Sequence, residues 1–158
     1  MLETPMRTVI CPTAAVDAPV ELVWMLLTAP AGWGDVFDIR IAAIDPPGPA
    51  AAGQTVYGES GPRLLRLKVA LQYAEIDPAH YRLGLHVRLP FGVTVREGLN
   101  CVPLERNRCH VAYRCDFGFP AGWRGAMARC LMRRKLASGP VDSLSRLKRA
   151  AERLHANS

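Results

Sequence analysis

Several features that would place this sequence in a membrane or outside the cell are missing. No apolar run in its 158 residues approaches the ~18 residues that a membrane-spanning helix needs. The stretch from Met1 to Arg7 contains Glu3 and Pro5 and has no apolar core, so it is unlike a signal peptide. We therefore expect a protein of the cytoplasm.

Metal-ligand spacing is also absent. No two of the five cysteines form a C-x-x-C pair, which is the spacing that most zinc sites show; they are Cys11, Cys101, Cys109, Cys115 and Cys130. The histidines fall at expected turns, on the outward phase of strands or near the C-terminus: His80, His86, His110 and His155. We expect no metal site, no cofactor, no nucleophile–base pair and cysteines that are reduced, partly buried thiols.

The composition is that of an ordinary globular protein. Hydrophobic residues make up 49% and charged residues 22% of the chain. A chain of this length can bury roughly 68–70% of its unfolded surface and needs no disulfide or metal to fold. We expect one domain over residues 1–158 and leave its oligomeric state open.

The order of helices and strands follows from periodicity and from breaks at proline and glycine. We expect a strand at 8–16, a helix that begins at Ala18-Pro19 and a short helix at 31–36. Strands should follow at 39–44 and 54–60, and then four strands with period two at 65–74, 81–89, 93–101 and 109–119. The last helix should cover 123–154, with a kink at Gly139-Pro140 and an apolar stripe of Met127, Cys130, Leu131, Ala137, Val141, Leu144, Leu147 and Leu154.

These elements predict an α+β fold. A curved, seven-stranded antiparallel sheet would wrap around a long C-terminal helix, with two short helices between strands 1 and 2. One helix with its side chains is about 10–12 Å wide, which is narrower than such a sheet. Either the sheet curls tightly or a cavity remains between sheet and helix.

The same order resembles the START / polyketide cyclase / Bet v 1-like superfamily, also called SRPBCC, with its helix-grip fold. The resemblance is carried by Val16-Asp-Ala-Pro-Val-Glu-Leu-Val-Trp24, by Trp33, by Gly53 before a strand, and by Leu144-Ser-Arg-Leu-Lys-Arg-Ala-Ala-Glu152. It implies a cavity that binds lipids, sterols, polyketides, plant hormones or quinones. A minority of such proteins are enzymes, such as aromatases and cyclases, and the superfamily offers no universal catalytic motif.

The residues expected to line the cavity are inward-facing and mostly apolar or aromatic. They are Trp33, Phe37, Tyr57, Val69, Leu71, Tyr73, Leu85, Leu99, Val111, Tyr113, Cys115, Phe117, Phe119, Met127 and Leu131. The alternative is that these side chains simply fill the core. The Pro- and Gly-rich loop from Asp45 to Gly53 is expected to act as a flexible mouth.

Glu97 is the one carboxyl group on the inward phase of the four alternating strands, and it is the candidate catalytic residue. Desolvation would raise its pKa, so that it could act as a general acid or base while a tyrosine orients a ligand carbonyl. The alternative is a bulge near Gly98 that turns Glu97 outward to pair with an arginine.

The chain has a net charge of +6 and two groups of basic residues. One group, on the outward phase of the strands, is Arg66, Lys68, Arg82, Arg88, Arg96 and Arg114; the other follows the last helix. No aromatic residues interleave with them, so nucleic acid is not the expected partner. A solvated surface is the simpler interpretation, and transient contact with an anionic membrane is the alternative.

Three function hypotheses result. The first is binding or transport of a small hydrophobic ligand such as a lipid, polyketide, quinone or aromatic molecule. The second is a cyclase, aromatase or dehydratase that acts in the same cavity. The third is an interaction protein that uses its basic surface at a membrane or a ribosome. The sequence alone does not name the ligand.

Overall fold

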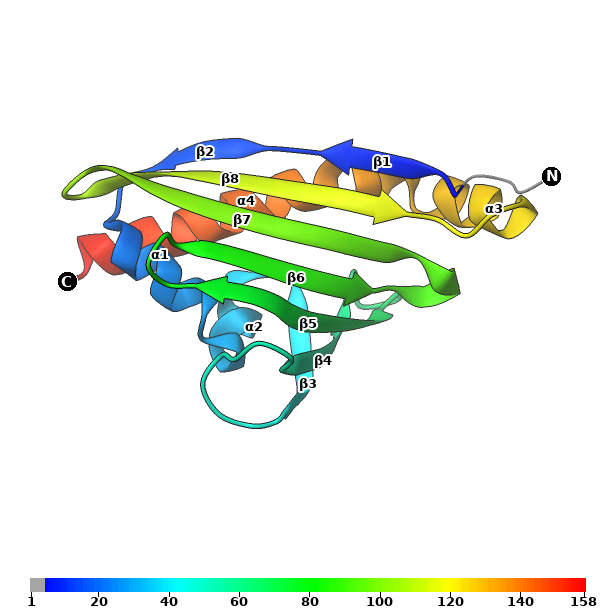
Figure 1. Cartoon of the computed structure of the whole chain (residues 1–158), viewed down its shortest axis with the longest axis horizontal. Coiled ribbons are helices and arrows are strands. Elements are labelled where there is room, and N and C mark those ends of the chain that lie inside the picture. The colour runs from blue at the N-terminus through cyan, green and yellow to red at the C-terminus, as the bar shows by residue number, and fades with distance from the viewer. Residues whose placement is uncertain (1–4) are drawn as a thin grey trace.

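The computed structural model describes residues 5–158, and its main feature is one antiparallel sheet that curves around a C-terminal helix (Figure 1). The eight strands are β1 (Arg7–Ile10), β2 (Thr13–Val16), β3 (Ile39–Asp45), β4 (Thr55–Ser60), β5 (Leu67–Asp77), β6 (Arg82–Arg88), β7 (Thr94–Glu105) and β8 (Arg108–Gly118). The helices are α1 (Val20–Leu27), η1 (Pro30–Gly32), α2 (Trp33–Val36), η2 (Pro90–Gly92), α3 (Trp123–Leu131) and α4 (Arg133–Ala156). Residues 1–4, part of the stretch judged unlike a signal peptide, lie outside the described range. Within residues 5–158 there is no helix with the length and apolar character needed to cross a bilayer.

The strands form a meander from β3 to β8, and the N-terminal strands return to the β8 edge. The sheet order is β1-β8-β7-β6-β5-β4-β3, and β2 also pairs with β8. The expected α+β class, antiparallel sheet and long C-terminal helix are therefore confirmed. The strand expected over 8–16 is instead two strands, β1 and β2, because Pro12 between them has no N–H to donate. Both strands pair with β8 in one continuous register. The backbone N–H of Tyr113 donates to the carbonyl of Pro12, so the chain stays in contact there.

The two segments that carried the family resemblance meet in space. Glu152 on α4 accepts a hydrogen bond from the backbone N–H of Asp17, at 3.0 Å, where β2 turns into α1. Lys148 donates to the carbonyl of Ala15, at 2.6 Å, and pairs with Glu152 at 3.0 Å. These contacts anchor the C-terminal half of α4 to the start of the fold.

The last helix has a different apolar face from the expected one, except at Leu144 and Leu147. A break at Met132 separates α3 from α4, and α4 runs on through Pro140. The buried residues recur every three or four positions along one face, with Ala150 beside Ala151, and are Gly125, Ala128, Met132, Leu136, Pro140, Leu144, Leu147, Ala150 and Ala151. In contrast, six residues of the expected stripe are exposed: Met127, Cys130, Leu131, Ala137, Val141 and Leu154.

Close packing of α3 explains this difference in phase. A Cβ added at Gly125 would collide with the Pro120 carbonyl, so the inner face of α3 admits only the smallest residues. Gly125 and Ala128 occupy that face. The larger side chains of Met127 and Leu131 are consequently left in solvent.

The loop between β3 and β4, which was expected to be a flexible mouth, is held by a buried amide. Gln54 is 1% exposed, and its Nε2 lies 2.9 Å, 3.0 Å and 3.2 Å from the carbonyl oxygens of Pro46, Gly48 and Pro49. The loop contributes no residue to the cavity described below. It is therefore a closed turn fixed from within rather than a mouth.

Candidate functional site

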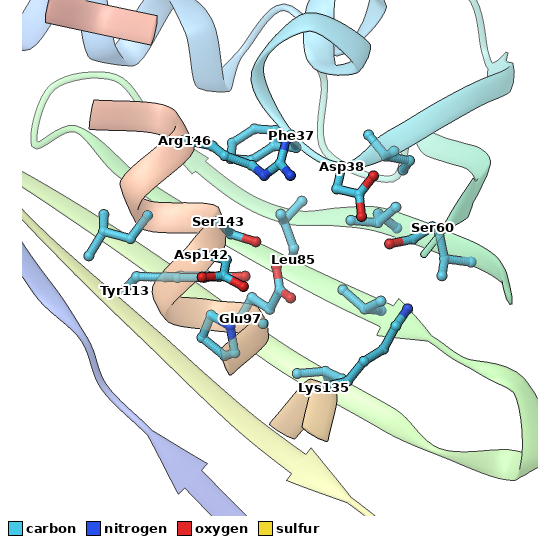
Figure 2. A pocket seen from close by; sticks show the side chains of 18 of the residues that line it. Phe37, Asp38, Ser60, Leu85, Glu97, Tyr113, Lys135, Asp142, Ser143 and Arg146 are labelled. Carbon is cyan, nitrogen blue, oxygen red and sulfur yellow. The ribbon is translucent and has the colours of Figure 1, made fainter. Parts of the chain in front are cut away.

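A cavity of about 370 Å³ lies between the concave face of the sheet and α4 (Figure 2). Most of its wall is apolar and comes from alternate residues of β5 to β8, because alternate residues of a strand face the same side of a sheet. These residues are Val69, Leu71, Leu83, Leu85, Val87, Val95, Leu99 and Phe117. Trp33 of α2 and Phe37, which follows that helix, close one side, and their rings meet edge to face at a centroid distance of 6.0 Å.

The mouth of the cavity is marked by the lining residues that are exposed. They come from the α2–β3 connection, the β4–β5 turn and α4: Asp38, Pro62, Arg134, Ser138, Asp142 and Arg146. Lys135 also lines this side and is half-buried. Burial lowers the pKa of the Lys135 ammonium group, and the nearby Asp38 charge acts in the opposite direction.

Glu97 faces into the cavity from β7, with Tyr113 of β8 beside it (Figure 2). The pairing of β7 with β8 has no irregularity from Thr94 to Pro103, so no bulge near Gly98 turns Glu97 outward. Of the two alternatives for Glu97, the structure shows the one in which its side chain faces inward. The carboxyl group thus lies on an otherwise apolar sheet face.

Burial changes the protonation of this pair. Desolvation raises the pKa of Glu97 to about 7, and a hydrogen bond with Tyr113 acts in the opposite direction. Burial and the Glu97 charge both raise the pKa of Tyr113 well above its usual value. Near neutral pH, Glu97 can therefore donate or accept a proton, while Tyr113 remains a neutral hydrogen-bonding group.

Nine of the sixteen residues predicted for the site line the cavity. They are Trp33, Phe37, Val69, Leu71, Leu85, Glu97, Leu99, Tyr113 and Phe117. Four others are buried in the core but do not reach the cavity: Tyr73, Val111, Cys115 and Phe119. The remaining three, Tyr57, Met127 and Leu131, are exposed outside it.

Each misplaced residue has a physical reason. The Tyr73 hydroxyl donates to the carbonyl of Leu27 at 2.9 Å, which holds the ring against Trp33 in the core. Tyr57 lies on the outward phase of β4, between the buried Val56 and Gly58. Val111 and Cys115 share the inward phase of β8 with Tyr113, and Phe119 follows the strand; all three are packed in the core away from the cavity. Met127 and Leu131 face solvent because of the close packing of α3.

The polar residues of the mouth were missed by sequence reasoning. Arg134, Lys135, Asp142 and Arg146 look like the ordinary solvated residues of an amphipathic helix, and no motif marks them as part of a site. Leu83, Val87 and Val95 could have been added, because they share the inward phase of Leu85 and Leu99.

The cysteines and metal-ligand types offer no second site in residues 5–158. No group of three His, Cys, Asp or Glu is placed to hold a metal ion there. Burial raises the pKa of Cys101 and of Cys115 to about 12, so both remain thiols at neutral pH.

The curved sheet, the short helices after β2, the long C-terminal helix and the apolar cavity define a helix-grip protein. The chain belongs to the family described as polyketide cyclase / dehydrase and lipid transport, whose model matches residues 10–152. The family resemblance predicted from the sequence is therefore confirmed. Membership supports a role in hydrophobic ligand binding or in cyclase-type chemistry.

Solved structures show the same fold at low sequence identity. A norcoclaurine synthase point mutant from Thalictrum flavum, in complex with a transition state analogue, has a TM-score of 0.72 and 13% identity over 98% of this chain and 99% of that one. The Zhui aromatase/cyclase from Streptomyces sp. R1128 has a TM-score of 0.69 and 19% identity over 91% of this chain and 95% of that one. Ara h 8.0201 has a TM-score of 0.66 and 8% identity over 92% of this chain and 98% of that one. Comparison with curated proteins finds no relative of significant sequence similarity.

Proposed function

We propose that this protein binds a small, largely apolar molecule in the cavity, with one polar group of that molecule facing Glu97 and Tyr113. The observation that carries the proposal is an apolar cavity of about 370 Å³ with a single carboxyl–phenol pair on its wall. Pockets of about 300–1,000 Å³ with a few placed polar groups are typical of small-molecule sites. A protonated Glu97 would donate a hydrogen bond to a carbonyl or hydroxyl oxygen of the ligand.

Binding of the neutral dye N-phenyl-1-naphthylamine tests this function. The dye should bind the wild-type protein with a saturable rise in fluorescence, because it exchanges water for an apolar wall. Leu85→Trp, which fills the cavity from β6, should weaken binding by about tenfold or more, equivalent to about 1.4 kcal/mol.

His86→Trp is the matched control, since it places the same side chain on the outward face of the same strand. It should bind the dye as the wild type does. Equal binding by the two variants would show that the dye lies elsewhere, and the proposed site would be wrong.

The second candidate function is proton-transfer catalysis in the same cavity. It is favoured by the pKa of Glu97, which is close to neutral, and by the Tyr113 phenol beside it. The ionised carboxyl group would take a proton from a carbon next to a ligand carbonyl, and the resulting enolate would attack a second carbonyl carbon of the same molecule. The proton would then pass from Glu97 to the new alkoxide oxygen.

Glu97→Gln separates catalysis from binding. If a poly-β-ketone is cyclised in the cavity, this variant should lower turnover by about 10²-fold or more, because an amide cannot accept the proton. Dye binding should persist, since the cavity keeps its shape. The measurement is the appearance of the cyclised hydroxy-ketone product by liquid chromatography. Turnover that matches the wild type would remove Glu97 from the mechanism.

A further inference from the structure

One end of the molecule carries a group of large apolar side chains in solvent. They come from the β4–β5 turn, η2 and α3, and we call them the apolar tip: Leu64, Leu65, Phe91, Trp123, Met127 and Leu131. Leu64 is 100% exposed and Trp123 is 71% exposed. Such side chains cost free energy in water, and their concentration at one end marks a surface that meets an apolar partner.

The three segments of the apolar tip lie together in the fold. η2 contacts α3, and a Cβ added at Gly92 would lie 3.0 Å from Pro120, just before α3. In Figure 1, α3 and the turn between β6 and β7 lie at the same end of the molecule. The β4–β5 turn reaches this region through Gly61, where an added Cβ would lie 3.4 Å from Lys135 Nζ.

Helix α3 has the pattern of a helix that lies on a membrane surface. Trp123, Met127 and Leu131 are spaced by four residues, so they share the outer face of the helix. The guanidinium group of Arg124 lies 5.7 Å from the centre of the Trp123 ring. A helix with an exposed apolar face and arginines beside it suits the boundary between lipid headgroups and acyl chains.

The charge around the tip is positive. Residues 117–141 contain five cationic side chains and no Asp or Glu: Arg124, Arg129, Arg133, Arg134 and Lys135. Residues 60–74, which include the β4–β5 turn, contain Arg63, Arg66 and Lys68 and no carboxyl group. Each basic residue near an anionic bilayer contributes about 1 kcal/mol to binding.

We propose that the apolar tip docks on an anionic lipid bilayer, with its apolar side chains among the lipid headgroups and its arginines against lipid phosphates. If two copies met tip to tip, the basic residues around one tip would face those around the other. The repulsion between these like charges disfavours a dimer through this surface. The tip also adjoins the cavity mouth, because Pro62 and Arg134 line the mouth and flank the tip. An apolar ligand could then move between bilayer and cavity with little exposure to water.

Sedimentation with lipid vesicles tests the docking surface. The full chain should partition onto vesicles of phosphatidylcholine mixed with phosphatidylglycerol and much less onto phosphatidylcholine alone. Trp123→Ser and Leu131→Ser should each weaken partition on the order of tenfold, since each loses one buried apolar group. Arg124→Gln and Arg133→Gln should each weaken it about fivefold.

Matched controls lie at the opposite end of the molecule, around the β7–β8 turn. Leu104 is exposed there, and so is Arg106, so Leu104→Ser and Arg106→Gln should partition as the wild type does. Leu85→Trp should also dock normally, which separates failure of this proposal from failure of the proposed cavity function. The emission of Trp123 should shift to the blue on anionic vesicles.

Four outcomes would overturn the proposal. The first is no partition onto either kind of vesicle, and the second is equal partition onto both. The third is an equal loss of partition in the control variants Leu104→Ser and Arg106→Gln. The fourth is a dimer in analytical ultracentrifugation that dissociates in Trp123→Ser. The last result would assign the tip to a second copy of the chain. Binding of the tip to a protein in place of lipid would appear as the first outcome.

Discussion

Glu97→Gln is expected to stabilise the protein at alkaline pH and to remove a downward slope of stability between pH 4.5 and pH 7. Below its ordinary pKa of 4.5, Glu97 is protonated in both the folded and the unfolded state. Between the two values the unfolded chain releases this proton and the folded protein keeps it, so the free energy of unfolding falls as pH rises. The full difference is about 3 kcal/mol and is complete above pH 7.

Urea unfolding at a series of pH values measures this effect. The difference between Glu97→Gln and the wild type should be small near pH 4 and should grow to about 3 kcal/mol above pH 7, because the amide mimics the protonated acid. Asp77 and Glu152, whose pKa values are lowered by hydrogen bonds, affect both proteins alike and cancel in the difference. Glu105→Gln, at an exposed position near the end of β7, should leave the wild-type curve unchanged. Parallel curves for the two proteins would mean that Glu97 is not desolvated.

Leu147→Ala is expected to destabilise the protein by about 3 kcal/mol or more. Leu147 is 1% exposed and lies where α4 covers both the core and the cavity. Removing a buried leucine loses transfer free energy and adds empty volume, and a site that already borders a cavity has few atoms able to fill the space.

Leu154→Ala provides the comparison on the same helix. Leu154 is 45% exposed, although the sequence placed both leucines on one apolar stripe. Its truncation should change the free energy of unfolding by only about 0.5 kcal/mol. Urea midpoints with unchanged slopes would measure both effects. Similar losses for the two variants would show that the C-terminal turn of α4 is packed more tightly than its exposure indicates.

The strands were the most predictable part of this molecule. Period two is a direct consequence of the pleat, and it survives wherever pairing is regular. It placed Glu97 and Tyr113 on one inward face because β7 and β8 pair without a shift over that stretch. It was wrong at Leu65, which precedes β5 and is exposed.

The last helix was less predictable because its environment changes along its length. Hydrophobicity ranks Met127 and Leu131 above Gly125 and Ala128, so a stripe drawn from the sequence passes through the larger residues. The approach of Pro120 to Gly125 reverses that choice. The contact between Pro120 and Gly125 decides which face of α3 is buried. The periodicity of the helix sequence alone does not reveal such a contact. The polar residues of the cavity mouth were not predicted for the same reason, because they come together only in the folded chain.

The curved sheet has consequences for how copies of this protein behave when crowded. Its two outer strands lie at β3 and at the β1–β2 pair. The pairing of β3 with β4 shifts register between Ile41 and Ala43. The opposite edge is interrupted at Pro12, so that β1 and β2 have only four residues each. Neither presents a long, straight row of free backbone donors and acceptors, so a neighbouring chain has little to extend into a fibril. The molecule can therefore keep apolar side chains at its tip without also offering a template for amyloid growth.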